Sequence, residues 1–453
     1  MKKTYHIITI GCQMNEADSE RIASYLEFYG FKHEPKRSKA GLVVLNTCGI
    51  RQTAESRNYG LIPLLKKENK NVKIILAGCL SERPDVRRRL EDRVDIWLPI
   101  QKLPELYKQL GLKKKSFGKG NYLNIEPKAV SPFSVYIPVG NGCDNFCAYC
   151  VVPYARGREQ YRSAYEIFQE AEKFIAKGYK ELTLIAQNVN SYRAIATKAD
   201  LKYFPHKKIG DQIFFWEVLL VTGVLPEILA TPAKGKAKII PNNYWVRFST
   251  SHPKDMGEDL IRVTARGGRF APHIHLPVQA GDNQILSAMN RKYSVEHYLG
   301  LTEKIKKAIP EVGLSSDIIV GFPGETRKQF ANTLKLAKKV KYDMIYMAQF
   351  SPRPGTAAFK MKDNVTAIEK KRREEELNEV LKKTALENNQ KFLNREIVVL
   401  VEEKNAKGKW LGKNGQMKTV IISGASDKKL AGRFCLVKIS EVKDFGLYGE
   451  FVK

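Results

Sequence analysis

The chain of 453 residues lacks an uninterrupted apolar run long enough to cross a membrane. The best candidate, residues 213–230, is broken by two glutamates, a glycine and a proline, and this composition indicates an interrupted soluble helix. The apolar run after the first three residues ends at Cys12, which is too short for the core of a secretory signal. We therefore expect a protein without a membrane partner.

Acidic residues are few compared with basic ones. The chain has 48 aspartates and glutamates against 77 lysines and arginines, so its formal net charge is +29. An excess of this size favours a polyanionic partner, most simply a nucleic acid, although charge that serves solubility alone is the alternative. Hydrophobic residues make up 43% of the chain, which is normal for globular domains with real cores.

Cysteines are also few, and their number, seven, is odd. An odd count without a secretory signal argues against a disulfide framework. We therefore expect reduced thiols and a cytoplasmic protein. Six of the seven cysteines fall into two groups of three, and Cys435 lies inside a strand pattern, which predicts a core position.

The second group of cysteines is the densest motif in the chain. Cys143, Cys147 and Cys150 have the spacing C-x3-C-x2-C, and Gly142 and Pro153 on either side indicate a loop. Thiolates are soft ligands that suit iron–sulfur clusters or zinc. Three ligands would leave one iron of a four-iron cluster open. A zinc site, or scattered structural thiols, is the alternative, but the chain has no second C-x2-C pair for a zinc ribbon.

The first group follows a repeated pattern. Three apolar runs of strand length, residues 6–10, 42–47 and 72–77, each end shortly before a cysteine, and helical patterns lie between them. Such runs predict a parallel sheet, whose ligands gather at the carboxyl ends of its strands. We therefore expect Cys12, Cys48 and Cys79 to meet at one edge as a second three-thiolate site. Three buried structural cysteines are the alternative.

The middle of the chain repeats strands and helices. Strands are predicted at residues 182–186, 246–250, 274–278, 314–320 and 344–350, with helical patterns between them. Repeated units of this length imply a parallel barrel, full or partial, with its chemistry at the carboxyl ends of the strands. From Glu396 onward, short β-rich runs without helices predict a small antiparallel barrel, in which Trp410 and Tyr448 are candidates for stacking on bases.

These motifs carry a resemblance that covers nearly the whole chain. The run from Gly142 to Arg158 resembles the tRNA methylthiotransferases of the radical S-adenosylmethionine (SAM) enzymes, and residues 396–453 resemble the RNA-binding TRAM domain. Further strings that resemble the family lie at residues 11–15, 46–48, 78–80, 186–192, 247–253, 275–281, 289–293 and 350–356.

The resemblance implies the domain plan. An amino-terminal α/β domain spans residues 1–120, a radical SAM partial barrel spans 130–385, and a TRAM-like barrel spans 390–453. Residues 194–243 are longer than expected between the family motifs, so we interpret them as a surface insertion.

The resemblance also implies cofactors and ligands. Cys143, Cys147 and Cys150 would hold a 4Fe–4S cluster whose open iron binds SAM, and Cys12, Cys48 and Cys79 would hold a second 4Fe–4S cluster that carries sulfur. Polar residues of the predicted strand ends are candidates to bind SAM, and Arg247 is the candidate for its carboxylate: Gln187, Arg247, Ser249, Gln279 and Asp317. A structural hydrogen bond at the barrel rim is the alternative for each.

Within the family, the strings at residues 11–15, 151–154 and 277–279 are most similar to the branch that adds a methylthio group at C2 of N6-dimethylallyladenosine next to the anticodon of tRNA. Implied partners are the tRNA anticodon loop, a sulfur donor and an electron donor such as flavodoxin or ferredoxin. Two alternatives stay open: a related enzyme that acts on threonylcarbamoyl-adenosine or on a ribosomal-protein aspartate, and a non-catalytic iron–sulfur RNA-binding protein.

Overall fold

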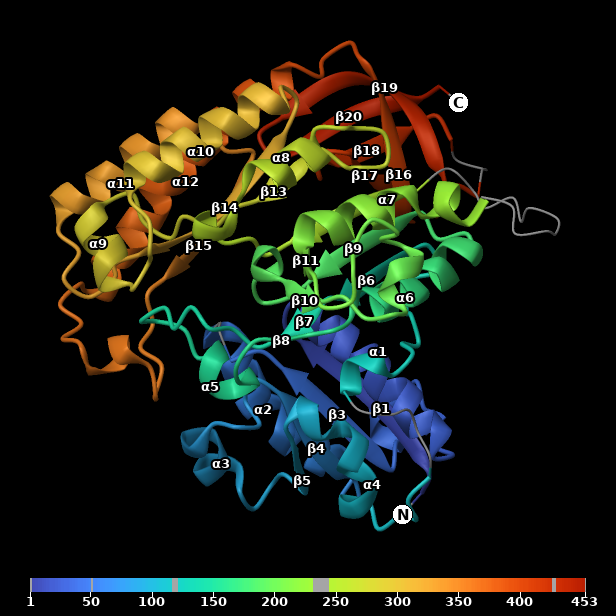
Figure 1. The fold of residues 1–453 in the computed structure, drawn as a ribbon. Coiled ribbons are helices and arrows are strands. Elements are labelled where there is room, and N and C mark those ends of the chain that lie inside the picture. The colour runs from blue at the N-terminus through green and yellow to red at the C-terminus, as the bar shows by residue number, and fades with distance from the viewer. Residues whose placement is uncertain (1, 50–51, 116–120, 231–243, 426–428, 453) are drawn as a thin grey trace.

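A computed structural model describes residues 2–49, 52–115, 121–230, 244–425 and 429–452. Three bodies follow one another along the chain (Figure 1): an α/β domain, a curved array of parallel strands with outer helices, and a small β-barrel. The predicted fold class is confirmed. Among the helices of these residues, none combines the length and the apolar character that a membrane span requires.

The amino-terminal domain is a five-stranded sheet in which every pair is parallel. Its strand order is β2 (Lys32–His33), β1 (Thr4–Ile10), β3 (Leu42–Thr47), β4 (Lys73–Gly78) and β5 (Ile96–Leu98). The helices that connect or follow these strands are α1 (Gln13–Phe28), α2 (Gln52–Glu68), α3 (Pro84–Leu90) and α4 (Leu106–Gln109).

Both faces of the central strands β3 and β4 are buried, which explains why these strands are largely apolar. Leu42 and Val44 of β3 pack with residues of α1 on one face. Val43 and Leu45 pack with Ile62 of α2 on the other face. Alternate side chains of a strand point to opposite faces, so a central strand covered by helices on both sides needs hydrophobic residues at every position.

The middle domain has two three-stranded parallel sheets. The first contains β6 (Ser134–Pro138), β9 (Glu181–Ile185) and β12 (Trp245–Ser249); the second contains β13 (His273–His275), β14 (Gly313–Val320) and β15 (Met344–Gln349). A parallel bridge between Val246 and Phe270 leads from the first sheet toward the second. The two sheets therefore form the curved wall of a partial barrel, in agreement with the prediction.

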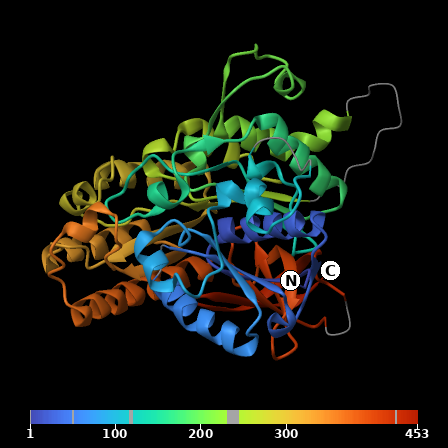
Figure 2. The same cartoon turned by 90° about the horizontal axis from the view of Figure 1, so that it is seen from below.

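Helices cover the outer side of this wall (Figures 1 and 2). They are α6 (Ala164–Ala176), α7 (Phe215–Ala230), α8 (Glu258–Thr264), α9 (Asn283–Ala288), α10 (Val295–Ala308), α11 (Arg327–Val340) and α12 (Ala367–Gln390). Two short elements, β7 (Gly140–Asn141) and β8 (Gln160–Tyr161), pair on either side of the second cysteine group, and α5 (Val152–Arg156) lies between them.

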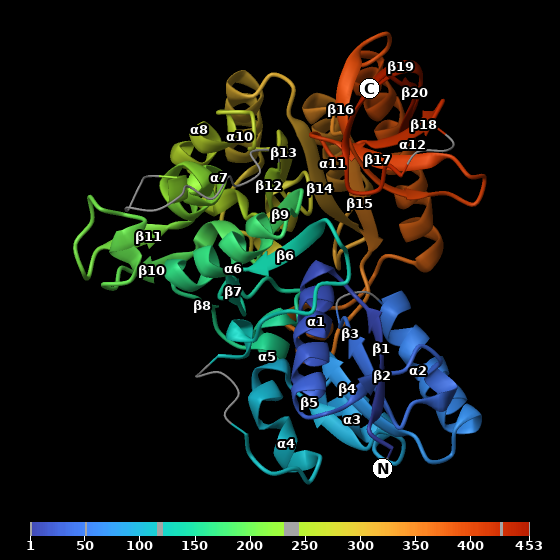
Figure 3. The same cartoon turned by 90° about the vertical axis from the view of Figure 1, so that its right-hand side faces the viewer.

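The interpretation of residues 194–243 as one surface insertion needs correction. The hairpin of β10 (Arg193–Ile195) and β11 (Gln212–Phe214) does project from the domain (Figures 2 and 3). Helix α7, however, follows it directly and buries Phe215, Val218 and Leu225 in the barrel core. The apolar composition of this helix thus reflects its place as the crossover between β9 and β12. Residues 231–243 lie outside the described residues.

The carboxy-terminal domain is a closed five-stranded barrel. Its strand order is β16 (Glu396–Lys404), β17 (Trp410–Asn414), β18 (Thr419–Ser423), β20 (Gly446–Phe451) and β19 (Phe434–Lys443). The β18–β20 pair is parallel and the others are antiparallel. Strands in a closed ring of five cannot alternate in direction all the way round, so one parallel pair is required.

Two side chains of this barrel can be compared with the prediction. Cys435 packs in the barrel core, as expected. Trp410 is also part of the core and donates from Nε1 to the Ala425 carbonyl at 3.0 Å, so its ring is not presented for stacking on a base. Tyr448 remains half-buried, with the Lys443 ammonium 4.7 Å from its ring centroid.

Helix α1 joins the first two domains. It lies beside β6 (Figure 3), and Met14 and Ala17 pack with Tyr136 and Ile185 of the barrel. Arg21, which is fully buried on this helix, pairs with Glu170 of α6 at 2.8 Å. A buried arginine and its carboxylate satisfy each other only in one relative position, so this pair fixes how the domains meet.

Candidate active site

The register of the amino-terminal sheet brings the first three cysteines together. Ile10 pairs with Thr47, and Thr47 pairs with Gly78, so β1, β3 and β4 end side by side. The ladder continues past the strands, because the Cys48 amide donates to the Ile10 carbonyl and the Cys79 amide to the Thr47 carbonyl, both at 2.9 Å. Cys12 follows β1 and is the N-cap of α1. The expected convergence at the carboxyl edge is therefore what the structure shows.

Glycines beside these cysteines let the strand ends approach closely. Gly78 has a φ of +80°, and a Cβ there would lie 2.4 Å from the Thr47 carbonyl oxygen. A Cβ at Gly49 would lie 3.2 Å from the Cβ of Cys79. The chain can therefore place Cys48 and Cys79 next to each other only because the neighbouring positions carry no side chain.

A buried arginine from the middle domain contacts this cysteine group. Arg156, the last residue of α5, donates from Nε to the Cys79 Sγ at 3.4 Å. Its Nη1 donates to Asn141 Oδ1 at 2.9 Å, and its Nη2 donates to Asp18 Oδ2 of α1 at 2.7 Å. Tyr122 donates to the same Asn141 oxygen at 3.2 Å. The network holds a positive charge against a thiol of the other domain.

A second buried arginine of the middle domain lies near Cys48. Arg353 donates to Glu55 Oε2 at 2.8 Å, and Arg83 donates to the same oxygen at 2.6 Å. Burial lowers the pKa of Arg353, while Glu55 and, to a smaller extent, the Cys48 thiol act against this shift. Arginines of both domains, Arg83 and Arg353, therefore share the carboxylate of Glu55 at this junction.

The second cysteine group is held in a loop with constrained backbone. The β7–β8 pair closes the base of the loop, and the Cys143 amide donates to the Gly157 carbonyl at 3.2 Å. Gly142 has a φ of +88°, and a Cβ there would meet the Arg158 carbonyl oxygen at 2.1 Å. Phe146, between the first two cysteines, has a φ of +46°, a strained value for an aromatic residue that is typical of functional loops.

Each thiol of this second group accepts one hydrogen bond. Asn145 Nδ2 donates to Cys143 at 3.4 Å, Arg291 Nη1 donates to Cys147 at 3.4 Å, and the Val152 amide donates to Cys150 at 3.5 Å. Donors of this kind stabilise thiolates and tune the metal group that thiolates hold. Asn145 and Arg291 could have been indicated only by the family strings that contain them.

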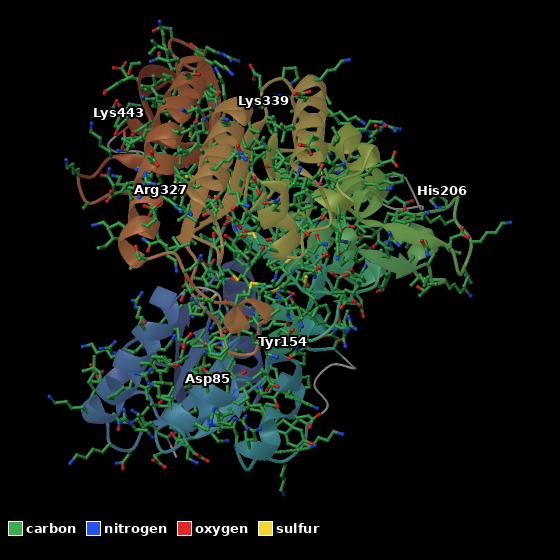
Figure 4. The ribbon with its side chains drawn as sticks, turned by 90° about the vertical axis from the view of Figure 1, so that its left-hand side faces the viewer. Asp85, Tyr154, His206, Arg327, Lys339 and Lys443 are labelled. Atoms are coloured by element: carbon green, nitrogen blue, oxygen red, sulfur yellow. The ribbon has the colours of Figure 1, made fainter. Side chains whose placement is uncertain are left out.

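The two cysteine groups are neighbours. Burial raises the pKa of Cys150, and the thiol of Cys79 in the other group adds to this shift. Cys12 is exposed to solvent, but the protein around it still raises the pKa of its thiol by desolvation. Arg156 acts to lower this pKa. Sulfur atoms gather at the junction of the two domains, near Tyr154 (Figure 4). The contact from Arg156, six residues after Cys150, to Cys79 links the two groups across this junction.

The donor sets suit iron–sulfur clusters. Each group offers three thiols, with glycines beside them in the chain and an arginine that donates to one thiol. Thiolates are the ligands of iron–sulfur clusters. Within the part of the chain that the structure describes, no three His, Cys, Asp or Glu side chains are placed to hold a single metal ion. This finding applies to a site for a single ion. In a cluster, each thiolate binds a different iron, so the three sulfur atoms need not surround one point.

Three of the five residues expected to bind SAM lie at the carboxyl edge of the barrel. Gln187 follows β9 and accepts a hydrogen bond from the Gly142 amide at 2.6 Å, so it positions the cysteine loop. Ser249 is the last residue of β12. Gln279 has a φ of +72°, and its backbone bonds to residues 317 and 319 of β14. Asp317 lies within β14, where its Oδ2 is 3.5 Å from His275 Nε2.

Arg247 takes a different position from the expected one. It lies in the middle of β12, where its Nε pairs with Glu181 Oε1 at 2.5 Å. Its Nη1 and Nη2 donate to the carbonyls of Gly415 and Asn414 in the carboxy-terminal barrel, at 2.6 and 2.9 Å. The guanidinium is buried and occupied, so the structure supports a link between two domains and not a contact with the SAM carboxylate.

Sequence reasoning missed two polar groups at the carboxyl edge. Asn188 Oδ1 and Ser251 Oγ are buried, and among the described residues neither has a hydrogen-bond partner. They follow β9 and β12, and Thr250 beside Ser251 has a φ of +73°. Buried polar atoms are rarely left unpaired, so these two are candidates to bind a polar ligand. Only the family strings that contain them could have indicated them.

Comparisons with known proteins divide the chain in the same order. Residues 4–98 match the Uncharacterized protein family UPF0004, residues 137–337 match the Radical SAM superfamily, and residues 390–452 match the TRAM domain. The match to the Radical SAM superfamily implies a 4Fe–4S cluster and SAM. A solved structure of the radical S-adenosylmethionine methyltransferase TsrM from Kitasatospora setae, with cobalamin and a 4Fe–4S cluster bound, aligns at 12% identity and a TM-score of 0.49 over 79% of this chain and 77% of that chain.

Curated relatives match over the full length. A tRNA-2-methylthio-N(6)-dimethylallyladenosine synthase from Carboxydothermus hydrogenoformans is 39% identical and covers 100% of both chains. The protein of the same name from Syntrophomonas wolfei is 38% identical over 98% of this chain and 97% of its own. Identity at this level over whole chains shows a shared family. The chain therefore belongs to the tRNA-2-methylthio-N(6)-dimethylallyladenosine synthase family, within the Radical SAM superfamily.

Proposed function

We propose that the chain is a radical SAM enzyme that adds a methylthio group at C2 of N6-dimethylallyladenosine, next to the anticodon of tRNA. The observation that carries the proposal is the pair of three-thiol groups at one domain junction, where Arg156, in the short helix that follows Cys150, donates to Cys79 of the other group at 3.4 Å. Relatives that match the whole chain carry the name of this activity. That name favours the dimethylallyl substrate over the threonylcarbamoyl and ribosomal-protein alternatives.

The six cysteines are the proposed ligands. Cys143, Cys147 and Cys150 would hold the 4Fe–4S cluster that works with SAM, and Cys12, Cys48 and Cys79 would hold a second 4Fe–4S cluster. Together these groups supply radical and sulfur chemistry, which an inert aromatic C–H bond requires and which side chains cannot provide. Asn188 and Ser251, whose buried Oδ1 and Oγ atoms have no hydrogen-bond partner among the described residues, join Gln187, Ser249, Gln279 and Asp317 as candidates to bind SAM or the base.

The residues of the chain orient these groups. Gln187 and the β7–β8 pair hold the loop of the second cysteine group, and Arg291 and Asn145 donate to its thiols. The Arg21–Glu170 pair fixes the amino-terminal domain against the barrel, so the two groups keep a constant separation. A constant separation matters because reacting groups must be held close and aligned for rates to rise.

The proposed substrate fits the charge and the domains. A net charge of +29 favours RNA, and the carboxy-terminal residues match the TRAM domain. The target base must leave its stack to enter the barrel, and an anticodon loop offers unpaired bases. We further propose a cytoplasmic location, a sulfur donor, an electron donor such as flavodoxin or ferredoxin, and functional domains at residues 1–120, 130–385 and 390–453.

The test uses anaerobic protein with reductant, SAM and tRNA that carries dimethylallyladenosine. We expect 2-methylthio-modified nucleoside by mass spectrometry, together with methionine and 5′-deoxyadenosine. A Cys12→Ala, Cys48→Ala, Cys79→Ala variant should lose about half of its iron, as expected for two equal clusters. Absence of both SAM products would overturn the enzymatic proposal, and full iron retention in the variant would overturn the second cluster.

A further inference from the structure

The first cysteine group is partnered by a side chain of another domain. Arg156 lies six residues after Cys150, at the end of the short helix α5, yet its Nε donates to Cys79 of the first group at 3.4 Å. We propose that Arg156 is a positioning residue of the first cysteine group, which raises the reduction potential of the cluster that Cys12, Cys48 and Cys79 hold. This inference rests on the proposed function, because it requires a cluster at these cysteines.

The geometry leaves the guanidinium little freedom. Arg156 is 3% exposed, and its three donating nitrogens are directed to three different acceptors, Cys79, Asn141 and Asp18. Asp18 is itself buried, and its Oδ1 has no partner among the described residues. The contact of its Oδ2 with Arg156 therefore holds the guanidinium in place. A planar fork fixed in this way keeps one N–H directed at sulfur.

A docking role alone would not require the sulfur contact. The Arg21–Glu170 pair, at the same domain junction and equally buried, joins the two domains without touching a cysteine. Arg353, also from the middle domain, donates to Glu55 of α2 at 2.8 Å, so a second buried guanidinium crosses between the two domains. Arg156 thus brings positive charge from the barrel domain to a cysteine of its neighbour.

The expected effect is electrostatic. Reduction adds negative charge to a cluster, and a buried positive charge or an N–H donor at its sulfurs stabilises that charge, so the reduction potential rises. Loss of Arg156 should therefore disfavour the reduced form. We expect about a tenfold change in the equilibrium constant, which is about 59 mV for one electron.

The experiment isolates the first cysteine group. The parent is the full chain with Cys143→Ala, Cys147→Ala and Cys150→Ala, reconstituted anaerobically with iron and sulfide. A redox titration followed by electron paramagnetic resonance gives the midpoint potential of its remaining cluster. We expect Arg156→Gln to lower the potential by about 59 mV, and Arg156→Lys, which keeps the charge but not the fork, to lower it less.

The matched control is Arg21→Gln, which breaks a buried pair at the same junction without a sulfur contact and should leave the potential unchanged. Equal potentials for the parent and both Arg156 variants would overturn this inference, and so would an equal drop in Arg21→Gln. If Arg156→Gln does not fold, the midpoint potential of Arg156→Lys is compared with that of the parent, and equal potentials overturn the inference. A parent without iron would overturn the second cluster of the proposed function and this inference together.

Discussion

A buried glutamate of α1 predicts how stability depends on pH. Glu20 is 7% exposed; its Oε1 accepts from the Val130 amide at 2.8 Å, while its Oε2 is buried without a partner among the described residues. Burial raises the pKa of Glu20 from 4.5 to about 7. The Val130 amide and Arg21 act against this shift, and Glu170 and Glu16 add to it.

The sign follows from proton binding. Between pH 4.5 and 7 the folded chain keeps the proton that the unfolded chain releases, so the free energy of unfolding falls as the pH rises through this range. Above pH 7 the full difference applies, which is about 3 kcal/mol for a change in pKa from 4.5 to 7. Glu20→Gln stays neutral and keeps an oxygen for the Val130 amide. It should therefore be more stable than the parent by about 3 kcal/mol at pH 8 and nearly equal at pH 4.5.

The assay is denaturant unfolding of parent and variant at a series of pH values between 4.5 and 8, with equal cluster loading. Glu91→Gln, an exposed glutamate in the same domain, is the control and should change neither the midpoint nor its pH dependence. A Glu20→Gln variant whose midpoint tracks that of the parent at every pH would refute the reasoning.

Two further predictions concern the carboxy-terminal barrel. Arg247→Ala removes one partner of a buried pair with Glu181, so we expect the free energy of unfolding to fall by about 3 kcal/mol. Because the contact with Gly415 is also lost, proteolysis should release residues 390–453 faster, with SAM affinity retained. Loss of SAM binding without release would contradict this prediction. Lys407→Ala with Lys409→Ala should weaken tRNA binding and reduce the slope of log affinity against log salt by about 0.7 per lost contact, whereas Lys338→Ala with Lys339→Ala on α11 should not. Equal slopes in the two double variants would be inconsistent with RNA contact by the barrel loop.

The parts of the fold that follow local patterns could be predicted from the sequence. The strands before Cys48 and Cys79 could be predicted because a strand buried on both faces needs apolar residues at nearly every position. The strand before Cys12 is partly exposed, but its isoleucines still indicate a strand. Their convergence then followed from the parallel register alone. The same logic misread α7, because an apolar helix interrupted by Gly223 and Pro226 looks alike whether it is inserted or belongs to the core.

Contacts between distant segments could not be predicted. Arg247 looked like a ligand because it stands in a polar string near a strand end, but its partners at residues 414 and 415 belong to another domain. Trp410 looked available for stacking, yet the closure of the barrel buries it. The contact from Arg156 to Cys79 was invisible for the same reason, since it depends on how two folded domains meet.

The arrangement of charges around the first cysteine group has a consequence for biosynthesis. Synthesis proceeds from the amino terminus, so Cys12, Cys48 and Cys79 leave the ribosome before Arg156, and long before Arg353. The nascent domain therefore lacks the contact from Arg156 to Cys79 until the barrel folds beside it. A translation product that stops short of Arg156 would contain the three thiols without the guanidinium that donates to Cys79 in the finished protein.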